Sequence, residues 1–263
     1  MSAATNFNIL TWQKDRLLIG DLLFRLELSF DKEEPCWAGN DFFKLFKPKE
    51  LVEQYEHVFS LFDFQTPKNI FEIGMYDGGS LALWNELFKP DKLVGIDIQN
   101  RDDSIYFTEY SKKEQLSGRL KPLWGVDQSD RETVKRIARE NFESTIDLII
   151  DDACHYYKES KISFETLFPL LSPGGLYVIE DWQWAHWKEF QNHDYFQGKQ
   201  ALTNLIADII ALTGSALPYS PKRIQINSRM VAIERGNEPA PPSFSLPAIP
   251  PLVNRQSAQT KLK

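Results

Sequence analysis

The sequence predicts an α/β fold, built as an open and mostly parallel sheet with helices on both faces. From residue 69 onward, short β-branched runs alternate with segments of helical periodicity, as expected of parallel strands joined by crossover helices. The strand candidates are continuous apolar runs, which indicates burial on both faces. A chain of 263 residues, with 42% hydrophobic and 25% charged residues, is long enough to bury such a core.

Five runs have the length and composition of buried strands. They are NIFEIG (69–74), KLVGIDI (92–98), KPLWGV (121–126), IDLIID (146–151) and LYVIED (176–181). Helices are expected between and after them, at about 79–88, 129–142, 159–171 and 198–213. Downstream, RIQINSRMVAIER reads as two strand-like runs joined at Asn227 and Ser228, which predicts a terminal hairpin. The expected result is a Rossmann-like mixed sheet of seven strands within residues 69–236.

Residues 1–68 are expected to form a helical segment that acts as a lid or as an oligomerisation element. Helical spacing is clearest in PKELVEQYEHVFSLF, whose periodic apolar residues are Leu51, Tyr55, Val58, Phe59 and Phe62. Charged residues such as Asp15 and Arg25 interrupt the apolar stretches near the N-terminus. This pattern indicates neither a signal peptide nor a membrane span.

The last residues, 237–263, have a different composition. They hold six prolines, followed by polar residues. Such a composition does not build a core element, so we expect an extended arm or a disordered tail.

The charge and the cysteine content restrict the partners and the compartment. A formal net charge of −7 argues against duplex nucleic acid as a partner, because phosphate binding relies on Lys and Arg. The two cysteines, Cys36 and Cys154, lie far apart in the sequence and offer neither a disulfide framework nor zinc-ligand spacing. These observations favour a cytoplasmic protein whose partner is a small molecule, with no nucleic acid and no membrane.

A glycine-rich loop follows the first strand, in FEIGMYDGGSLALW. Gly74, Gly78 and Gly79 lead directly into a helix, as expected where the backbone approaches a ligand and the helix N-terminus offers free N–H donors. The spacing is G-x-x-x-G-G and not the tighter G-x-G-x-x-G of dinucleotide enzymes. With the acidic Glu72 before it, this loop suits a ligand that carries an amino acid instead of phosphates. The alternative is that these glycines only form turns.

Polar side chains at the ends of the next two strands extend this candidate site. The second strand ends in Asp97, where a carboxylate can accept hydrogen bonds from both ribose hydroxyls. The third strand closes at GVDQSD, which places Asp127 and Gln128 near an adenine edge. Ligands of open parallel sheets bind beyond the carboxyl ends of the strands. A simple strand cap is the alternative role for Asp97.

These features resemble the class I S-adenosylmethionine-dependent methyltransferases. EIGMYDGGS resembles the first motif of that family, and Asp97 resembles its ribose-binding acid. The resemblance implies S-adenosylmethionine as the cofactor and a set of residues around it. That set is Glu72, Gly74, Tyr76, Gly78, Gly79, Ser80, Asp97, Asp127 and Asp151.

Paired acids end the fourth and fifth strands, in IIDDACH and YVIEDWQW. In the methyltransferase sheet order these strands are neighbours, so Asp151, Asp152, Glu180 and Asp181 would converge on one rim. Carboxylates this close repel one another unless they are protonated or neutralised, and Mg²⁺ is the simplest neutralising cation. His155 stands where a general base could take a proton from a substrate hydroxyl. Alternation along the strand leaves Asp151 a second role, as a cap of the following turn.

Residues 146–184 resemble one branch of the superfamily, the metal-dependent sugar O-methyltransferases of macrolide biosynthesis and the related cephalosporin-hydroxylase-like proteins. The resemblance rests on DDACH (151–155), on FETLFPLLSPGGLYVIED (164–181) and on Trp182. It implies Asp152, Glu180 and Asp181 as metal ligands, His155 as the catalytic base and Gln128 as a further active-site residue. Two features depart from the branch: Cys154 replaces a small polar residue, and the N-terminal region does not resemble the larger auxiliary domain of the macrolide enzymes.

The expected function is Mg²⁺-assisted methylation of a hydroxyl by S-adenosylmethionine, on a sugar or vicinal diol of a small-molecule natural product. Five aromatic residues near the rim suggest a wall for the substrate, although core packing is the alternative. They are Tyr156, Tyr157, Trp182, Trp184 and Trp187. A catechol or phenol O-methyltransferase, an oxidative tailoring role and a non-catalytic cofactor-binding partner in a biosynthetic complex are the alternatives. We expect a homo-oligomer.

Overall fold

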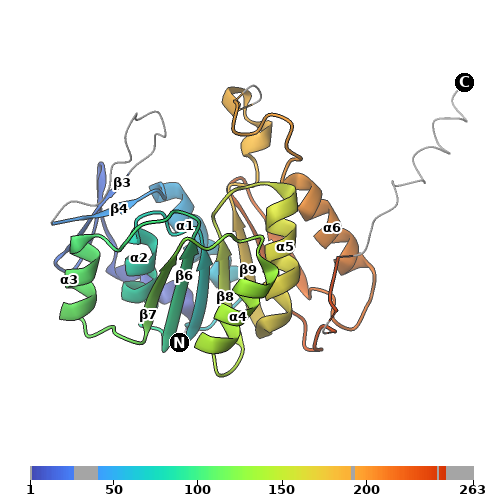
Figure 1. The fold of residues 1–263 in the computed structure, drawn as a ribbon, viewed down its shortest axis with the longest axis horizontal. Coiled ribbons are helices and arrows are strands. Elements are labelled where there is room, and N and C mark those ends of the chain that lie inside the picture. Colours follow the sequence, from blue (N-terminus) through green and yellow to red (C-terminus); the bar gives the residue numbers. More distant parts are fainter. Residues whose placement is uncertain (1, 27–40, 191–192, 242, 247–263) are drawn as a thin grey trace, which may run out of the picture.

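The computed structural model of the chain describes residues 2–26, 41–190, 193–241 and 243–246 (Figure 1). Its main sheet has seven strands in the order β10-β11-β9-β8-β5-β6-β7. Strands β5 to β9 run parallel to one another. The hairpin β10–β11 joins β9 in antiparallel orientation. The predicted α/β class, the mixed seven-stranded sheet and the terminal hairpin are therefore confirmed.

The elements of this sheet and its helices follow one another along the chain. The strands are β5 (Asn69–Ile73), β6 (Lys92–Asp97), β7 (Leu120–Trp124), β8 (Ile146–Asp151), β9 (Leu171–Glu180), β10 (Arg223–Ile226) and β11 (Met230–Glu234). The helices are α2 (Gly79–Phe88), α3 (Ile105–Lys113), α4 (Arg131–Asn141), α5 (Tyr157–Leu167) and α6 (Thr203–Gly214). Among these, α3 was not expected, and β9 begins five residues before the predicted strand.

Alternate residues of the strands face two separate cores. In β8, Leu148 and Ile150 join the core that contains α1 (Lys49–Leu61) and α2. Ile149 between them joins the core that contains α4, α5 and α6. All three side chains are fully buried. This double burial explains why the strand has no apolar–polar alternation.

The N-terminal region differs from the predicted helical segment. Only α1 matches the expected helix, and it packs on the main sheet. Before it lie a short 3-10 helix, η1 (Ala3–Ile9), and a four-stranded sheet made of β1 (Thr11–Gln13), β2 (Arg16–Ile19), β3 (Leu22–Leu26) and β4 (Phe43–Leu45). Leu17, Phe24 and Phe43 of this small sheet are fully buried in the same core as α2. Cross-strand packing of these residues overrides the helical pattern.

Part of the proline-rich tail packs on the domain. Phe244 and Leu246 are 5% exposed and belong to the core beneath α5. The Phe244 ring lies 5.7 Å from the Phe168 ring, and Glu165 accepts a hydrogen bond from the Leu246 N–H. Two apolar side chains are thus enough to anchor this stretch. The remaining tail, 247–263, lies outside the described residues.

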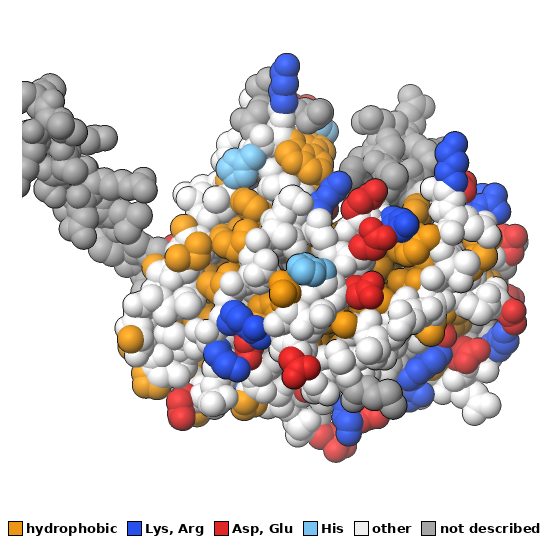
Figure 2. Space-filling view, turned by 180° about the vertical axis from the view of Figure 1, so that it is seen from behind, with side chains coloured by type: hydrophobic (Ala, Val, Ile, Leu, Met, Phe, Trp, Pro, Cys, Tyr) orange, Lys and Arg blue, Asp and Glu red, His pale blue; other side chains and the backbone are white. Residues whose placement is uncertain are grey.

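The surface mixes charges of both signs. Figure 2 shows acidic and basic side chains interspersed over the face seen from behind. Within the described ranges, no helix has both the length and the apolar character needed to cross a membrane.

Candidate active site

A cavity of about 910 Å³ opens at the carboxyl ends of β5, β6, β8 and β9. Its wall is formed by residues 44–48, 73–76, 96–99, 126–128, 152–156 and 181, with further side chains from the segment between β9 and α6. That segment projects beyond the sheet in Figure 1. The volume is at the upper end of the range for small-molecule sites, so the cavity has room for a cofactor and an acceptor together.

Close approach of protein backbone explains two of the three glycines in the loop after β5. A β-carbon on Gly74 would lie 2.1 Å from the carbonyl oxygen of Asp152, and one on Gly79 would lie 1.8 Å from that of Lys44. A β-carbon on Gly78 would meet the Phe107 ring. The glycines were predicted to admit a ligand, but these neighbours belong to the chain itself. Gly78 and Gly79 do not line the cavity, whereas Gly74 does.

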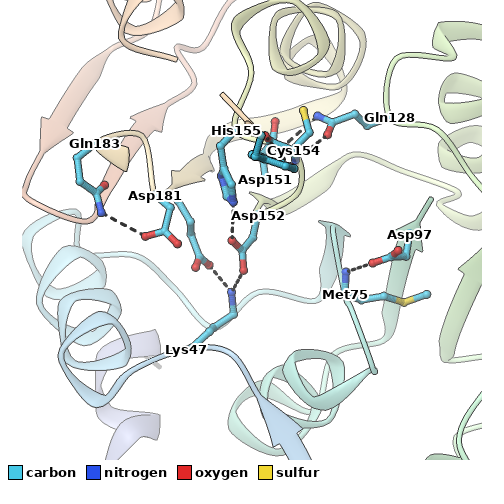
Figure 3. Close-up of polar contacts among 12 residues, drawn as sticks. Lys47, Met75, Asp97, Gln128, Asp151, Asp152, Cys154, His155, Asp181 and Gln183 are labelled. Carbon is cyan, nitrogen blue, oxygen red and sulfur yellow. Dashed lines mark hydrogen bonds and ion pairs between the residues drawn. The ribbon is translucent and has the colours of Figure 1, made fainter. Parts of the chain in front are cut away.

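Asp97 organises the loop and also faces the cavity. Its Oδ2 accepts the backbone N–H group of Met75 at 3.1 Å (Figure 3). The same oxygen accepts the N–H of Tyr76 at 2.8 Å, and Oδ1 accepts that of Gln99 at 2.9 Å. A carboxylate offers about four acceptor positions, so about one remains for a ligand hydroxyl. Tyr76, Ser80 and Asp127 also line the cavity. The structure brings these four predicted cofactor residues together.

Glu72 lies beneath the loop and not in the cavity wall. It is fully buried, and it accepts hydrogen bonds from Ser80 Oγ at 2.8 Å and Trp84 Nε1 at 3.0 Å. Burial raises the pKa of Glu72 to about 7, although the positive charge of Lys47 opposes this shift. The carboxyl group that was predicted to contact the cofactor therefore connects β5 to α2 instead.

Asp151 also points away from the cavity, as the alternation along β8 suggested. It is 2% exposed and accepts a hydrogen bond from the Tyr177 hydroxyl at 3.2 Å. Burial raises its pKa to about 7. Gln128 does line the cavity, where it donates to Ser163 Oγ at 2.9 Å and accepts the Cys154 N–H at 3.3 Å. These contacts let Gln128 hold the 152–155 loop in position.

Asp152, His155 and Asp181 meet at the rim of the cavity. One candidate ligand atom from each lies within 4.8 Å of the other two. His155 Nε2 lies 3.8 Å from Asp152 Oδ1. Both His155 (φ 55°) and Asp181 (φ 51°) have left-handed backbone conformations, which are uncommon for residues other than glycine and are often found at functional sites.

The imidazole of His155 has the position and the protonation state that a proton acceptor requires. Burial lowers the pKa of its imidazole, while the negative charge of Asp181 acts in the opposite direction. The ring is therefore neutral at pH 7 and has a lone pair for a proton. The Trp184 ring packs against it, with centroids 4.6 Å apart.

Glu180 does not belong to this group. It forms an ion pair with Lys47, a residue that the sequence pattern did not indicate. Lys47 Nζ lies 2.6 Å from Glu180 Oε1 and 2.6 Å from Asp152 Oδ2 (Figure 3). The Tyr55 hydroxyl donates to the same Glu180 oxygen at 2.5 Å. Burial alone would lower the pKa of Lys47, but the two carboxylates outweigh it and raise that pKa. Lys47 is one of two lysines in the apolar stretch FFKLFK, and nothing in the sequence distinguishes it for this role.

The donor set fits a hard divalent cation through two carboxylates. Mg²⁺ commonly takes one or two carboxylates and keeps several water molecules. Asp152 and Asp181 both face the cavity and could serve in this way. Glu180, the third predicted ligand, does not line the cavity. Lys47 and Tyr55 donate to its Oε1, whereas its Oε2 is buried and has no hydrogen-bond partner among the described residues.

Aromatic side chains form the outer wall of the cavity. Trp184 stacks on Phe190 with centroids 5.2 Å apart, and Trp187 lies under the guanidinium of Arg229. Tyr156, Tyr195 and Phe196 complete the wall. Of the five aromatics expected here, Tyr157 and Trp182 lie elsewhere, since they hydrogen-bond Asp208 and the Asn227 carbonyl.

Comparison with known proteins agrees with this architecture. Residues 71–182 match the family model described as a methyltransferase domain. This segment of the chain is similar to a methyltransferase domain. The matched range of this methyltransferase domain begins within β5 and ends just after β9, and it contains both the glycine loop and the acidic rim.

Several relatives of this segment are O-methyltransferases by name. The mycinamicin VI 2''-O-methyltransferase of Micromonospora griseorubida is 33% identical over 163 residues, which are 59% of this chain and 37% of the relative. The demethylmacrocin O-methyltransferase of Streptomyces fradiae is 34% identical over 143 residues, 52% of this chain and 32% of the relative. The chain thus spans only about a third of the length of these relatives.

A solved structure shares the fold. It is the MycE methyltransferase from the mycinamycin biosynthetic pathway, in complex with Mg, SAH and mycinamycin VI. The match has 26% sequence identity and a TM-score of 0.53, and it covers 76% of this chain and 53% of that chain. The resemblance of the methyltransferase domain to the macrolide sugar O-methyltransferases is therefore confirmed.

Proposed function

We propose that the domain transfers the methyl group of S-adenosylmethionine to a hydroxyl of a small-molecule natural product, with the help of Mg²⁺ or another divalent cation. The observation that carries this proposal is one cavity with two chemically different parts. The loop fixed by Asp97 lines one part, and the Asp152–His155–Asp181 group lines the other. This arrangement favours binding of the cofactor next to the acceptor hydroxyl.

Within the proposed reaction, each part of the site has a separate task. The sulfonium of the cofactor needs no activation, so the chain has to orient the acceptor hydroxyl in line with the S–CH₃ bond and remove its proton. His155, neutral at pH 7, would accept that proton. Bound at Asp152 and Asp181, the divalent cation would supply positive charge that lowers the pKa of the hydroxyl.

A sugar or another vicinal diol is the acceptor class that the site supports best. Two neighbouring oxygens suit a cation that keeps open positions after binding Asp152 and Asp181. Relatives named as 2''-O-, 2'-O- and 3'-O-methyltransferases of glycosylated products support this class. The aromatic wall offers flat apolar faces for the rest of such an acceptor.

An acceptor panel tests this proposal. Purified protein with S-adenosylmethionine and Mg²⁺ is given glycosides with free vicinal hydroxyls, matched deoxy-glycosides and catechols. S-adenosylhomocysteine release with the vicinal glycosides alone is the expected result. Release with catechols alone would overturn the sugar assignment in favour of a catechol enzyme.

We also propose a homo-oligomer in the cytoplasm. The low cysteine content supports a reducing compartment. Light scattering after size-exclusion chromatography tests the oligomeric state, and a monomeric mass at micromolar concentration would contradict it.

A further inference from the structure

Arg229 is a positively charged residue of the cavity wall, in the turn between β10 and β11. Within the described part of the chain, no carboxylate lies within ion-pair distance of its guanidinium. Lys47 in the same wall differs, because Glu180 and Asp152 each hold its ammonium at 2.6 Å. The guanidinium of Arg229 is therefore available to a bound anion.

The Trp187 ring orders this guanidinium and leaves it donors for a ligand. Arg229 Cζ lies 5.2 Å from the centroid of the ring, within the range of a cation–π interaction. A guanidinium has five N–H donors in a planar fork. That fork matches the two oxygens of a carboxylate, which it can bind through two parallel hydrogen bonds. A carboxylate is therefore the ligand group that suits Arg229 best.

The backbone places Arg229 beside the acidic rim. Its carbonyl oxygen accepts the N–H of Asp181 at 2.8 Å, and the next residue, Met230, pairs with Glu180 across β11 and β9. Arg229 thus stands opposite Asp181 at the end of this antiparallel pair, where the β-carbons of opposite residues are typically about 5 Å apart. A small ligand can therefore contact Arg229 and the rim at the same time.

The anion that fits Arg229 belongs to the acceptor and not to the cofactor. Strand β11 is three positions away from β5 in the sheet order, which corresponds to about 14 Å at a strand spacing of about 4.8 Å. The amino-acid end of the cofactor is expected at the glycine loop after β5. Its carboxylate would therefore lie far from Arg229, whereas an acceptor at the rim would lie next to it.

We propose that the acceptor is an acidic sugar, a glycoside whose ring carries a carboxylate that Arg229 binds while its vicinal hydroxyls face the rim. This inference rests on the proposed function and narrows its acceptor class. The divalent cation of that function offsets the charges of Asp152 and Asp181, so that an anion is not repelled there. Arg229 is then a specificity-determining residue and takes no part in proton transfer.

Calorimetric titration of the full chain, with S-adenosylhomocysteine and Mg²⁺ present, measures acceptor binding without methyl transfer. The ligands are the methyl glycosides of glucuronic, galacturonic and mannuronic acid, each compared with its own carboxylate methyl ester. The two members of a pair have the same free hydroxyls and differ in charge. At least one acid should bind about tenfold or more tightly than its ester, as expected for hydrogen bonds between charged groups. Equal or absent binding in all three pairs would overturn the proposal.

Substitution of Arg229 tests whether its side chain causes this preference. Arg229→Gln should remove the preference and change the binding of the ester by less than about threefold, since the ester has no charge to lose. Arg229→Lys keeps the charge without the fork, so the preference should be intermediate. A preference that survives Arg229→Gln would contradict the proposal.

Lys199→Gln is the matched control for loss of one positive charge on the aromatic wall. Lys199 lies over the Tyr156 ring, 4.8 Å from its centroid, and does not line the cavity. Solvent screens its charge, so the preference should change by less than about twofold. A loss equal to that of Arg229→Gln would reduce the effect to overall charge and refute a specific contact.

The binding results are separate from those of the methyl-transfer assay. Turnover of neutral glycosides together with equal binding of acids and esters would refute this inference and leave the proposed function standing. Preference for an acid without turnover of any glycoside would refute the proposed function alone.

Discussion

The first turn of α2 packs directly on β4, so that a β-carbon on Gly79 would lie 1.8 Å from the carbonyl oxygen of Lys44. This contact joins the small N-terminal sheet to the loop that precedes α2. It also holds β4 in place, and the connection that brings Lys47 to the acidic rim begins at the end of β4. The N-terminal region is therefore part of the site's framework.

Gly79→Ala should destabilise the protein because β4 and α2 would have to separate. Overpacking of a well-packed contact costs about 1–3 kcal/mol, and a clash with backbone lies at the upper end. Gly214→Ala is the control, since no atom beyond its chain neighbours and the backbone of its own helix lies within 4 Å of the position its β-carbon would take. Urea unfolding should show a loss of about 2 kcal/mol or more for Gly79→Ala and a change within about 1 kcal/mol for Gly214→Ala. Equal stabilities would show that the contact is loose.

Glu72 should make the protein less stable as the pH rises. Its folded-state pKa of about 7 exceeds the ordinary 4.5, so between these values the folded chain holds a proton that the unfolded chain has lost. The stabilisation is complete below pH 4.5 and disappears as the pH rises through about 7, with a total of about 3 kcal/mol. Glu72→Gln removes the titration. The difference between the unfolding free energies of the two proteins should change by about 2.5 kcal/mol from pH 5 to pH 8, and a constant difference would contradict the shift.

Asp97→Asn should weaken cofactor binding, because the amide replaces a charged acceptor that both orders the loop and faces the ligand. Loss of a hydrogen bond to a charged group corresponds to about a 10- to 100-fold loss of affinity. Calorimetric titration with S-adenosylhomocysteine measures it. Asp127→Asn provides the comparison, since its carboxylate is exposed and already accepts from Ser129. A larger loss for Asp127→Asn would assign the ribose contact elsewhere.

The main sheet could be predicted because its strands are buried on both faces. IDLIID matches β8, and the helix expected at 79–88 matches α2. Burial of every position produces a local signal, namely a continuous apolar run. The N-terminal sheet has no such signal, since β1 to β4 are only three to five residues long and are stabilised by contacts with distant parts of the chain.

The site was predictable where a motif places a residue at a strand end. Asp97, Asp152, His155 and Asp181 follow strands in this way, and all four line the cavity. The roles of Glu72 and Asp151 depend on which partners surround them in space, and the sequence does not contain that information. The same holds for Lys47, which reaches the rim from a segment more than one hundred residues away from Asp152.

The most direct test of the proposed reaction is S-adenosylhomocysteine release from an accepted glycoside, measured for the wild type and for His155→Ala, with Mg²⁺ and with a chelator. Loss of a general base should reduce the rate by about 10²- to 10⁴-fold, while S-adenosylhomocysteine binding stays unchanged. His57→Ala, on the exposed face of α1, should keep full activity. The chelator should abolish wild-type turnover. Turnover that survives both the chelator and His155→Ala would contradict the assignment of this rim as the catalytic centre.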